Sequence, residues 1–319
     1  MRIYFAPLEG VTDTVYRRTH RECFGGVEKY FIPFISPTQH LALTSREQRA
    51  VSPAENAGVP VVPQILTKEA AHFVAMANNL ADLGYKEVNL NLGCPSGTVT
   101  AKGKGAGMLR DPEGLRRFLD ELYAHVRVKV SIKTRIGFAS VDEWPRLASI
   151  FPEYPVSELI VHPRTRAEFY RGQPHPQLLE ALNGAPFDVV YNGDLNLPAD
   201  CFAFSDRCPG VSALMIGRGL VANPALAQEV CGGPALTVEA LRAFAELLLK
   251  RYLECWPANA VIGHMHEILR YMLCCFEDPM PIRRLLRKAK TVDQLRQAMD
   301  RLFETYALRA EPGFSMDQL

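Results

Sequence analysis

The chain lacks any hydrophobic run long enough to cross a membrane. In its 319 residues no apolar stretch approaches the roughly 18 residues that a spanning helix needs. Residues 1–7 have the pattern of neither a signal peptide nor a membrane anchor. These absences predict a protein of the cytoplasm that has no membrane partner.

Paired-cysteine motifs are also missing. The eight cysteines contain no C-x-x-C spacing, and Cys274 and Cys275 are merely adjacent, so neither a zinc site nor a disulfide framework is predicted. His264 and His266 do not change this interpretation, because an i, i+2 spacing places the two rings on different faces of a helix. We therefore expect a reducing compartment and no metal.

The chain has almost no excess of charge of either sign. Its 36 Lys and Arg residues face 35 Asp and Glu residues, which gives a net charge of +1. Such a balance excludes bulk electrostatic attraction to nucleic acid. Any RNA-binding surface must come from local clusters of cations.

Strand-like runs alternate with helical spacers through the first two-thirds of the chain. The spacers at 68–83 and 112–125 carry apolar residues at helical period. Repeated eight times, this alternation predicts a (β/α)₈ barrel, the TIM-barrel fold, over residues 1–235. The expected strands cover residues 3–6, 30–35, 61–66, 87–92, 128–134, 158–162, 188–191 and 213–216.

The remaining residues, 236–319, predict an all-helical C-terminal domain. Helices are expected at 237–256, 260–277 and 291–307, with Thr237 as an N-cap and with Pro279 and Pro281 in the segment that joins the last two. A basic cluster without acids follows these prolines. Its members are Arg283, Arg284, Arg287, Lys288 and Lys290.

The fourth strand ends in the most informative motif, Gly93-Cys94-Pro95. A glycine turn and a rigid proline hold one thiol at the end of a buried strand, which is where α/β barrels keep their chemistry. An isolated cysteine of this kind is more often structural than reactive. The interpretation therefore depends on the residues that end the other strands.

Polar or glycine residues end most of the other strands too. All strand ends of a barrel meet at one face, so these residues predict a single site. Lys133 and His162 interrupt otherwise apolar strands, and Lys133 could be a Schiff-base amine or a fixed cation beside an anionic cofactor. The glycine turns at 192–194 and 217–219 follow strands seven and eight, the usual phosphate-binding place in such barrels.

Six ordered motifs resemble the dihydrouridine synthases, FMN-dependent oxidoreductases that reduce uridine in tRNA with NADPH. The resemblance covers nearly the whole chain and implies a flavoprotein of tRNA processing. The motifs are Ala-Pro-Leu-Glu-Gly-Val-Thr-Asp at 6–13, Asn-Leu-Gly-Cys-Pro at 91–95, Lys-Thr-Arg at 133–135, His-Pro-Arg-Thr at 162–165, Asn-Gly-Asp at 192–194 and Gly-Arg-Gly at 217–219.

The resemblance implies roles for individual residues. Cys94 is the implied catalytic acid, and Asn91 is expected to orient the pyrimidine. The implied FMN contacts are Pro7, Leu8, Glu9, Gln64, Lys133, His162, Asn192, Gly193, Asp194, Gly217 and Arg218. The expected RNA contacts are Asn91, Arg135, Arg164, Lys102, Arg284, Arg287 and Lys288, with Lys104, Arg166 and Arg171 extending the basic surface.

The chemistry of uridine reduction suits these residue types. Saturating the 5,6 double bond needs a hydride at one carbon and a proton at the other. A thiol with the ordinary pKa of about 8.5 is mostly protonated at neutral pH and can donate that proton. The target base must also leave its stack to reach the site.

Three positions depart from the family pattern. Leu8 replaces the usual methionine, and Asn89 stands where aspartate is common. Pro163 replaces a glycine and so deletes one backbone N–H. None of these changes removes the catalytic set.

Four alternatives stay open at this stage. The same chemistry could act on ribosomal RNA, or an FMN dehydrogenase could act on a small pyrimidine, although the basic helical tail counts against the latter. A non-catalytic RNA-binding protein and a type I aldolase built on Lys133 are further alternatives. The sequence sets neither the uridine position nor the preference between NADPH and NADH; a monomer is expected.

Overall fold

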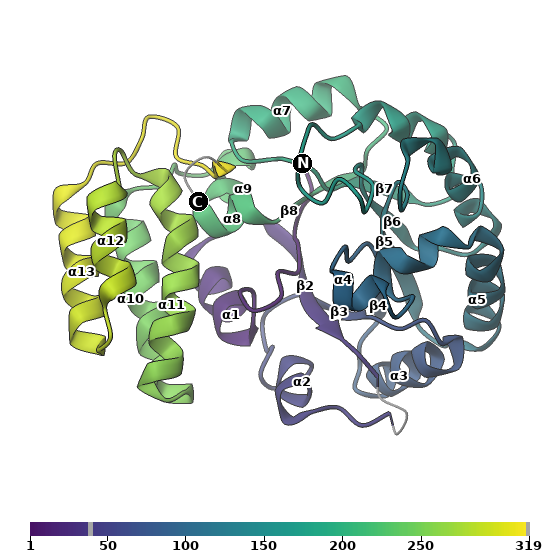
Figure 1. Ribbon diagram of the computed structural model, residues 1–319, viewed down its shortest axis with the longest axis horizontal. Coiled ribbons are helices and arrows are strands. Elements are labelled where there is room, and N and C mark those ends of the chain that lie inside the picture. The colour runs from purple at the N-terminus through teal and green to yellow at the C-terminus, as the bar shows by residue number, and fades with distance from the viewer. Residues whose placement is uncertain (38–40, 317–319) are drawn as a thin grey trace. The chain divides into compact units, whose positions relative to one another are not determined.

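The protein contains a closed barrel of eight parallel strands in chain order. The computed structural model describes residues 1–37 and 41–316. In these residues each strand neighbours the next one along the chain, from β1 to β8 (Figure 1). The predicted (β/α)₈ barrel is confirmed. Its strands are β1 Ile3–Phe5, β2 Val27–Ile35, β3 Val61–Ile65, β4 Glu87–Leu92, β5 Lys129–Arg135, β6 Glu158–His162, β7 Asp188–Tyr191 and β8 Ala213–Ile216.

The chain divides into two compact units. The first comprises Met1–Glu28, Asp194–Arg207 and Ile216–Leu319, and the second comprises Lys29–Gly193 and Cys208–Met215. The domain boundary that we placed at residue 235 stays a prediction.

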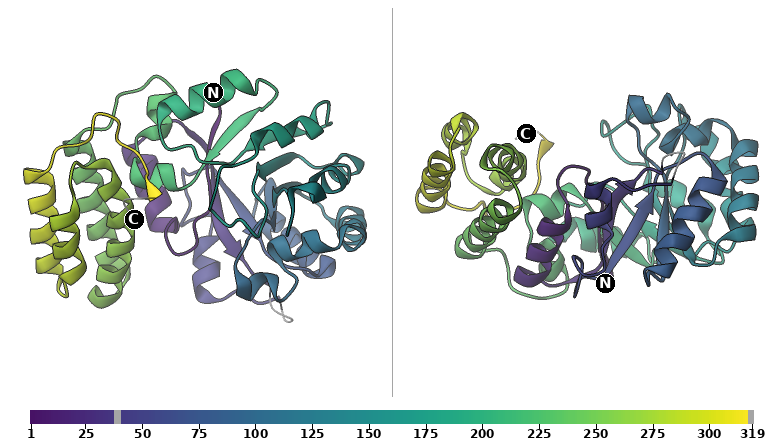
Figure 2. Two further views of the ribbon diagram at one scale, coloured as in Figure 1. Left: turned by 45° about the horizontal axis from the view of Figure 1, so that its top comes forward. Right: turned by 90° about the horizontal axis from the view of Figure 1, so that it is seen from below.

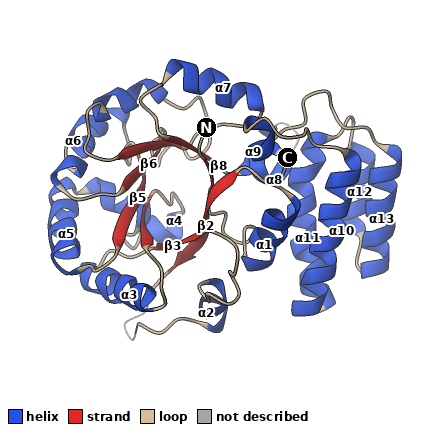
Figure 3. Cartoon of the chain, turned by 180° about the vertical axis from the view of Figure 1, so that it is seen from behind, coloured by secondary structure: helices blue, strands red, loops and turns tan. Residues whose placement is uncertain are grey.

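Helices lie outside the strands in the second unit. Figure 3 shows α3 (Ala70–Asp82), α5 (Pro112–His125) and α6 (Trp144–Ala148) around β3 to β6. In α5 the Asp111 side chain accepts a hydrogen bond from the backbone of Gly114 and caps the helix. Leu115, Phe118, Leu119 and Leu122 repeat at helical spacing and are buried, which fixes α5 against the sheet.

The register of the parallel strands places polar residues side by side. Gln64 of β3 pairs with Asn89 of β4, and Asn91 of β4 pairs with Lys133 of β5. Side chains alternate between the two faces of a strand, so Asn89 and Asn91 point to the same side. Neighbouring strands therefore present a polar layer inside an otherwise apolar core.

The first unit carries the C-terminal helices α10 (Val238–Cys255), α11 (Ala258–Met272), α12 (Met280–Lys288) and α13 (Val292–Thr305). They lie side by side in both views of Figure 2, and α10 packs against α1 (Thr14–Cys23). Thr237 caps α10 as predicted, accepting a hydrogen bond from the backbone of Ala240. The predicted helical C-terminal region is confirmed.

Helix α12 was not predicted. Pro281 lies in its first turn, where a missing N–H costs nothing, so the prolines begin a helix instead of joining two others. Ile282 and Leu286, four residues apart, are buried and hold the helix down. The helix expected at 260–277 ends at Met272, followed by a 3₁₀ turn.

Shorter helices complete the fold. Among all the helices that the structure describes, none is both long and apolar enough to cross a membrane. The remaining α-helices are α2 Ser45–Ala50, α4 Gly97–Thr100, α7 Pro198–Arg207, α8 Arg218–Ala222 and α9 Leu226–Val230. The 3₁₀ helices are η1 Gly105–Arg110, η2 Val141–Glu143, η3 Phe151–Glu153, η4 Pro176–Leu182 and η5 Leu273–Cys275.

Candidate functional site

The Cys94 turn is fixed by a side chain of the strand that precedes it. The Oδ1 atom of Asn91 accepts hydrogen bonds from the backbone N–H groups of Gly93, at 3.1 Å, and Cys94, at 2.9 Å. The carbonyl of Cys94 accepts a third from the backbone of Ala106, at 3.2 Å. Cys94 itself is partly exposed. A rigid turn thus presents an accessible thiol.

Asn91 ends a buried relay of amide groups. Its Nδ2 donates to Oε1 of Gln64 at 2.7 Å, and Nε2 of Gln64 donates to Oδ1 of Asn89 at 2.8 Å. Nδ2 of Asn89 donates in turn to Oγ of Ser131 at 2.9 Å. These hydrogen bonds join β3, β4 and β5 next to the Cys94 turn. The predicted ligand contacts of Gln64 and Asn91 stay predictions; each amide nitrogen has a second hydrogen to donate, and Oε1 of Gln64 has a second lone pair to accept with.

We expect Asn91→Ala to destabilise the fold by about 1–3 kcal/mol, because it leaves buried polar groups without partners. Turnover should fall as well, since the Cys94 turn loses its acceptor, whereas flavin content should persist. Thermal unfolding and single-turnover kinetics measure the two effects. Asn79→Ala, at an exposed position of α3, is the matched control; equal unfolding temperatures in the two variants would contradict the relay.

Lys133 lies beside Asn192 at the ends of β5 and β7. Its Nζ donates to Oδ1 of Asn192 at 2.6 Å, while Nδ2 of Asn192 donates to the carbonyl of Met215 at 2.8 Å. The pKa of Lys133 is lowered to about 7, first by burial and then by the charge of Arg135, while the thiolate form of Cys94 opposes both. This amine therefore changes charge near neutral pH and responds to the charge of whatever binds next to it.

Arg135 clamps backbone carbonyls of two loops. Its Nε donates to the carbonyl of Gly93 at 3.0 Å, and its Nη1 donates to those of Thr165 at 2.8 Å and Phe169 at 2.7 Å. Burial lowers the pKa of this guanidinium, which is 2% exposed. The clamp ties the Cys94 turn to the loop after β6. Substrate contact by Arg135 stays a prediction.

Arg164 is buried next to His162. Its Nη1 lies 3.3 Å from Nε2 of His162, and its Nη2 donates to the carbonyl of Gly172 at 2.6 Å. The sequence had led us to expect Arg164 on a basic surface. Arg164 is only 1% exposed, so it does not extend such a surface. It positions the His162 ring instead. The carbonyl of Pro163, between them, accepts a hydrogen bond from the backbone of His175 at 2.8 Å.

The first unit holds the other predicted cofactor residues. Pro7, Leu8 and Glu9 form a turn in which the carbonyl of Leu8 accepts the backbone N–H groups of Val11 and Thr12, both at 3.0 Å. Arg218 pairs with Asp194, Nη2 to Oδ1, at 3.1 Å. These contacts bring the Asn-Gly-Asp and Gly-Arg-Gly motifs together.

Two glycines of these motifs are required by close contacts. A Cβ at Gly219 would lie 2.3 Å from the carbonyl oxygen of Leu195, and a Cβ at Gly193 would lie 2.0 Å from the hydroxyl of Tyr191. Gly217 differs, because a Cβ there would make ordinary contacts of 3.5 Å with Ala6 and Leu8. Small apolar side chains therefore border the Gly217 turn.

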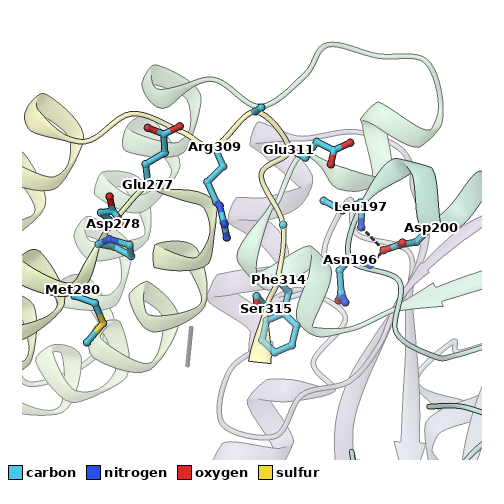
Figure 4. Close-up of a pocket in the computed structure, with 13 residues that line it drawn as sticks. Asn196, Leu197, Asp200, Glu277, Asp278, Met280, Arg309, Glu311, Phe314 and Ser315 are labelled. Atoms are coloured by element: carbon cyan, nitrogen blue, oxygen red, sulfur yellow. Dashed lines mark hydrogen bonds between the residues drawn. The ribbon is translucent and has the colours of Figure 1, made fainter. Parts of the chain in front are cut away.

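The C-terminal segment packs on this cluster, which the sequence did not reveal. The Arg218 guanidinium lies 4.7 Å from the ring centre of Phe314. The same segment borders a cavity of about 790 Å³ beside the turn at Asn196 and Leu197 (Figure 4). Four acids line this cavity against one cation, so it does not suit a phosphate. They are Asp200, Glu277, Asp278 and Glu311, with Arg309 as the cation.

The predicted RNA contacts Arg284, Arg287 and Lys288 are exposed on α12, and Lys102 is exposed after α4. Arg284 and Lys288 line a hollow of about 230 Å³ together with Arg301 and Tyr306. Among the residues that the structure describes, no acid lines this hollow; the others that do are Pro281, Ile282 and Leu285. Within the described residues, no cluster of three or more His, Cys, Asp or Glu side chains could hold a metal ion.

Comparisons with known proteins agree on one family. The model of the family described as "Dihydrouridine synthase (Dus)" matches residues 4–309. A Staphylococcus epidermidis protein named "Probable tRNA-dihydrouridine synthase" is 31% identical over 238 residues, which cover 69% of this chain and 68% of that protein. "Probable tRNA-dihydrouridine synthase 2" of Bacillus subtilis is 29% identical over 226 residues, covering 69% of each.

Among solved structures, "Morphinone reductase" matches with a TM-score of 0.52 at 12% identity, covering 74% of this chain and 87% of that one. A likeness at this identity supports the barrel fold alone.

Proposed function

The chain belongs to the dihydrouridine synthase family, a family of oxidoreductases, and we propose that it uses FMN and NADPH to reduce a uridine of tRNA to 5,6-dihydrouridine. The observation that carries this proposal is the Cys94 turn. Asn91 fixes this turn and its partly exposed thiol, and Lys133 of β5 is the register partner of Asn91.

The residues that carry the predicted FMN contacts suit an anionic flavin nucleotide. Arg218 supplies a cation for the phosphate, and the backbone N–H groups of the glycine turn at 217 are its proposed donors. Lys133 supplies a cation for the ring, and burial together with the charge of Arg135 lowers its pKa, which an anionic partner would raise again. The proposed contacts remain those implied by the motifs: Pro7, Leu8, Glu9, Gln64, Lys133, His162, Asn192, Gly193, Asp194, Gly217 and Arg218.

Cys94 is the proposed proton donor. Reduced FMN, when bound, supplies the hydride to one carbon of the 5,6 double bond. The Cys94 thiol gives its proton to the other carbon, and solvent later restores that proton. Asn91 holds the backbone that aims the sulfur, and Arg135 holds the same turn through the carbonyl of Gly93. These two side chains position the acid.

A basic hollow on α12 supports a folded RNA as the substrate. Arg284, Lys288 and Arg301 gather there without a neighbouring acid among the lining residues. A small pyrimidine would need no such surface, so tRNA is favoured over a nucleobase. Ribosomal RNA is the second candidate because the same cations would bind its phosphates. Action in the cytoplasm as a monomer stays a prediction.

The proposed function is tested first by cofactor content and product. The purified protein should be yellow with one non-covalent FMN per chain, and mapping dihydrouridine in RNA from cells with and without the gene should reveal the missing modification. A colourless protein that cannot be reconstituted with FMN would refute the proposal. Loss of dihydrouridine from ribosomal RNA alone would move the substrate to the second candidate.

Lys133 predicts a pH dependence of FMN binding. An anionic partner raises the pKa of Lys133 above its value of about 7 in the free protein. Binding then takes up a proton at pH values between the two pKa values, so FMN affinity should fall as pH rises through that window, by about tenfold per pH unit at most. Lys133→Met should bind FMN more weakly and lose this dependence. Fluorescence titrations at pH 7 and pH 9 measure both; an unchanged slope in Lys133→Met would remove Lys133 from the cofactor contacts.

A further inference from the structure

Arginine and phenylalanine side chains alternate in a stack over three loops of the second unit. The Arg110 guanidinium lies 3.8 Å from the ring centre of Phe138. The Arg166 guanidinium lies 5.3 Å from the Phe138 ring and 4.9 Å from the Phe169 ring. Because the loops follow β4, β5 and β6, the four side chains lie at the carboxyl ends of the strands. We name Arg110, Phe138, Arg166 and Phe169 the Arg–Phe ladder.

Hydrogen bonds hold the ladder rigid and join it to the Cys94 turn. Backbone N–H groups of Arg166 and Ala167 donate to the carbonyls of Gly137 and Phe138, both at 2.9 Å. The Nε of Arg166 donates to the carbonyl of Pro95, the residue after Cys94, at 3.1 Å. The ladder is therefore fixed one residue from the proposed proton donor.

Phe169, at the end of the ladder, is held in a conformation that folding alone does not favour. Phe169 is 38% exposed, although burial of an aromatic ring is favourable. Its φ of +54° lies in the left-handed region, which is strained for a residue with a side chain. Arg135 accommodates this conformation by donating to the Phe169 carbonyl at 2.7 Å. Strained, exposed residues of this kind gather at ligand-binding sites.

The charges around the ladder favour an anionic ligand with flat rings. Arg110 and Arg166 carry the cations. Glu143 is engaged in the loop after β5, where its carboxylate accepts the backbone N–H of Phe138 at 2.6 Å. Glu168 is engaged in the loop after β6. Its carboxylate accepts the backbone N–H of Thr165 and lies 2.8 Å from Nε2 of His175. An exposed aromatic face backed by guanidinium groups is the arrangement that stacks single-stranded bases and contacts their phosphates.

We propose that the Arg–Phe ladder is a stacking platform for an unpaired base that neighbours the target uridine in the RNA. This inference rests on the proposed function. When the target leaves the stack, its neighbour loses one stacking partner, and Phe169 replaces that partner. The platform makes the enzyme read an unpaired RNA strand without reading its sequence, because every base offers a flat face.

Salt dependence separates stacking from charge. Phe169→Ala should weaken binding of the tRNA transcript by roughly 5- to 150-fold, with the same slope of log affinity against log salt as the parent. Arg166→Lys keeps the charge but loses the flat guanidinium, so it should act in the same direction with an unchanged slope. Phe202→Ala, at a 46%-exposed ring on α7, is the matched control and should leave affinity unchanged. Flavin content and NADPH oxidation should match the parent in all three.

An abasic RNA provides the second arm of the test. Once the modified uridine is mapped, removing the base on either side of it should weaken binding to the parent and abolish the further effect of Phe169→Ala at the position that stacks. An additive loss at both positions, or affinity of Phe169→Ala within twofold of the parent, would overturn the platform. Phe169→Leu replaces the alanine variant if that variant loses its flavin. Failure of the proposed function is distinguishable, because the parent would then lack FMN or leave uridine intact.

Discussion

Cys94→Ala should lower the rate of uridine reduction by roughly two to four orders of magnitude, the usual contribution of a positioned acid. FMN binding and NADPH oxidation with an artificial acceptor should remain close to those of the parent, because neither step needs the thiol proton. The turn should survive the substitution. Its backbone N–H groups are held by Asn91 and its carbonyl by Ala106, and the sulfur takes no part in these hydrogen bonds.

Two measurements separate this role from a structural one. Rapid mixing of the reduced enzyme with tRNA follows flavin reoxidation by the substrate, and steady-state NADPH oxidation with an artificial acceptor follows the other half-reaction. Cys255, the last residue of α10, is exposed. Cys255→Ala is the matched control and should change the rate of neither half-reaction. Equal loss of both half-reactions in Cys94→Ala would make Cys94 a packing residue and leave the proton donor to be found elsewhere.

Residues close in sequence allowed the strands to be predicted well. Strands β4, β6, β7 and β8 have the predicted bounds, since each is a short, largely buried run that is followed by a glycine, a polar residue or a proline. Helix α12 was missed because its prolines were taken as a connection. In the structure these prolines lie at the start of a helix, which the buried side chains of Ile282 and Leu286 hold in place.

The positions of site residues were easier to predict than their partners. Substrate contact by Asn91 and Arg135 stays a prediction. What the sequence did not predict is that these side chains also bind the backbone of Gly93, Cys94 and the loop after β6. Strand spacing does contain one signal for the relay: Asn89 and Asn91 are two residues apart and share a face. The acceptors of Arg135 lie 30 and 34 residues away in a loop of irregular backbone, which no local pattern specifies.

The basic surface shows the same limit. A run of arginines predicts cations but not whether each one is buried. Arg164 is 1% exposed and serves His162, whereas Arg166 stacks between two phenylalanines. Burial depends on how the loops after β5 and β6 fold together, and this is decided by tertiary contacts.

The cations of α12 predict the second large effect. Replacing Arg284, Arg287 and Lys288 together with alanine should weaken tRNA binding by roughly 100-fold in low salt, and the slope of log affinity against log salt should flatten by about 2 to 3, because three phosphate contacts no longer release counterions. Flavin content and the Cys94-independent oxidation of NADPH should stay unchanged. Filter binding or fluorescence anisotropy across a salt series measures the slope.

The matched control removes three exposed cations from the second unit. Lys86, Arg127 and Lys129 lie at or before the first residues of β4 and β5, so they flank the amino ends of these strands. Their triple replacement changes the net charge by the same amount. If both triple variants lose affinity equally, only overall charge matters and α12 makes no defined contact. If neither changes the salt slope, the phosphates are held at the loops around Lys102 and Arg166, and the hollow beside Arg301 serves packing alone.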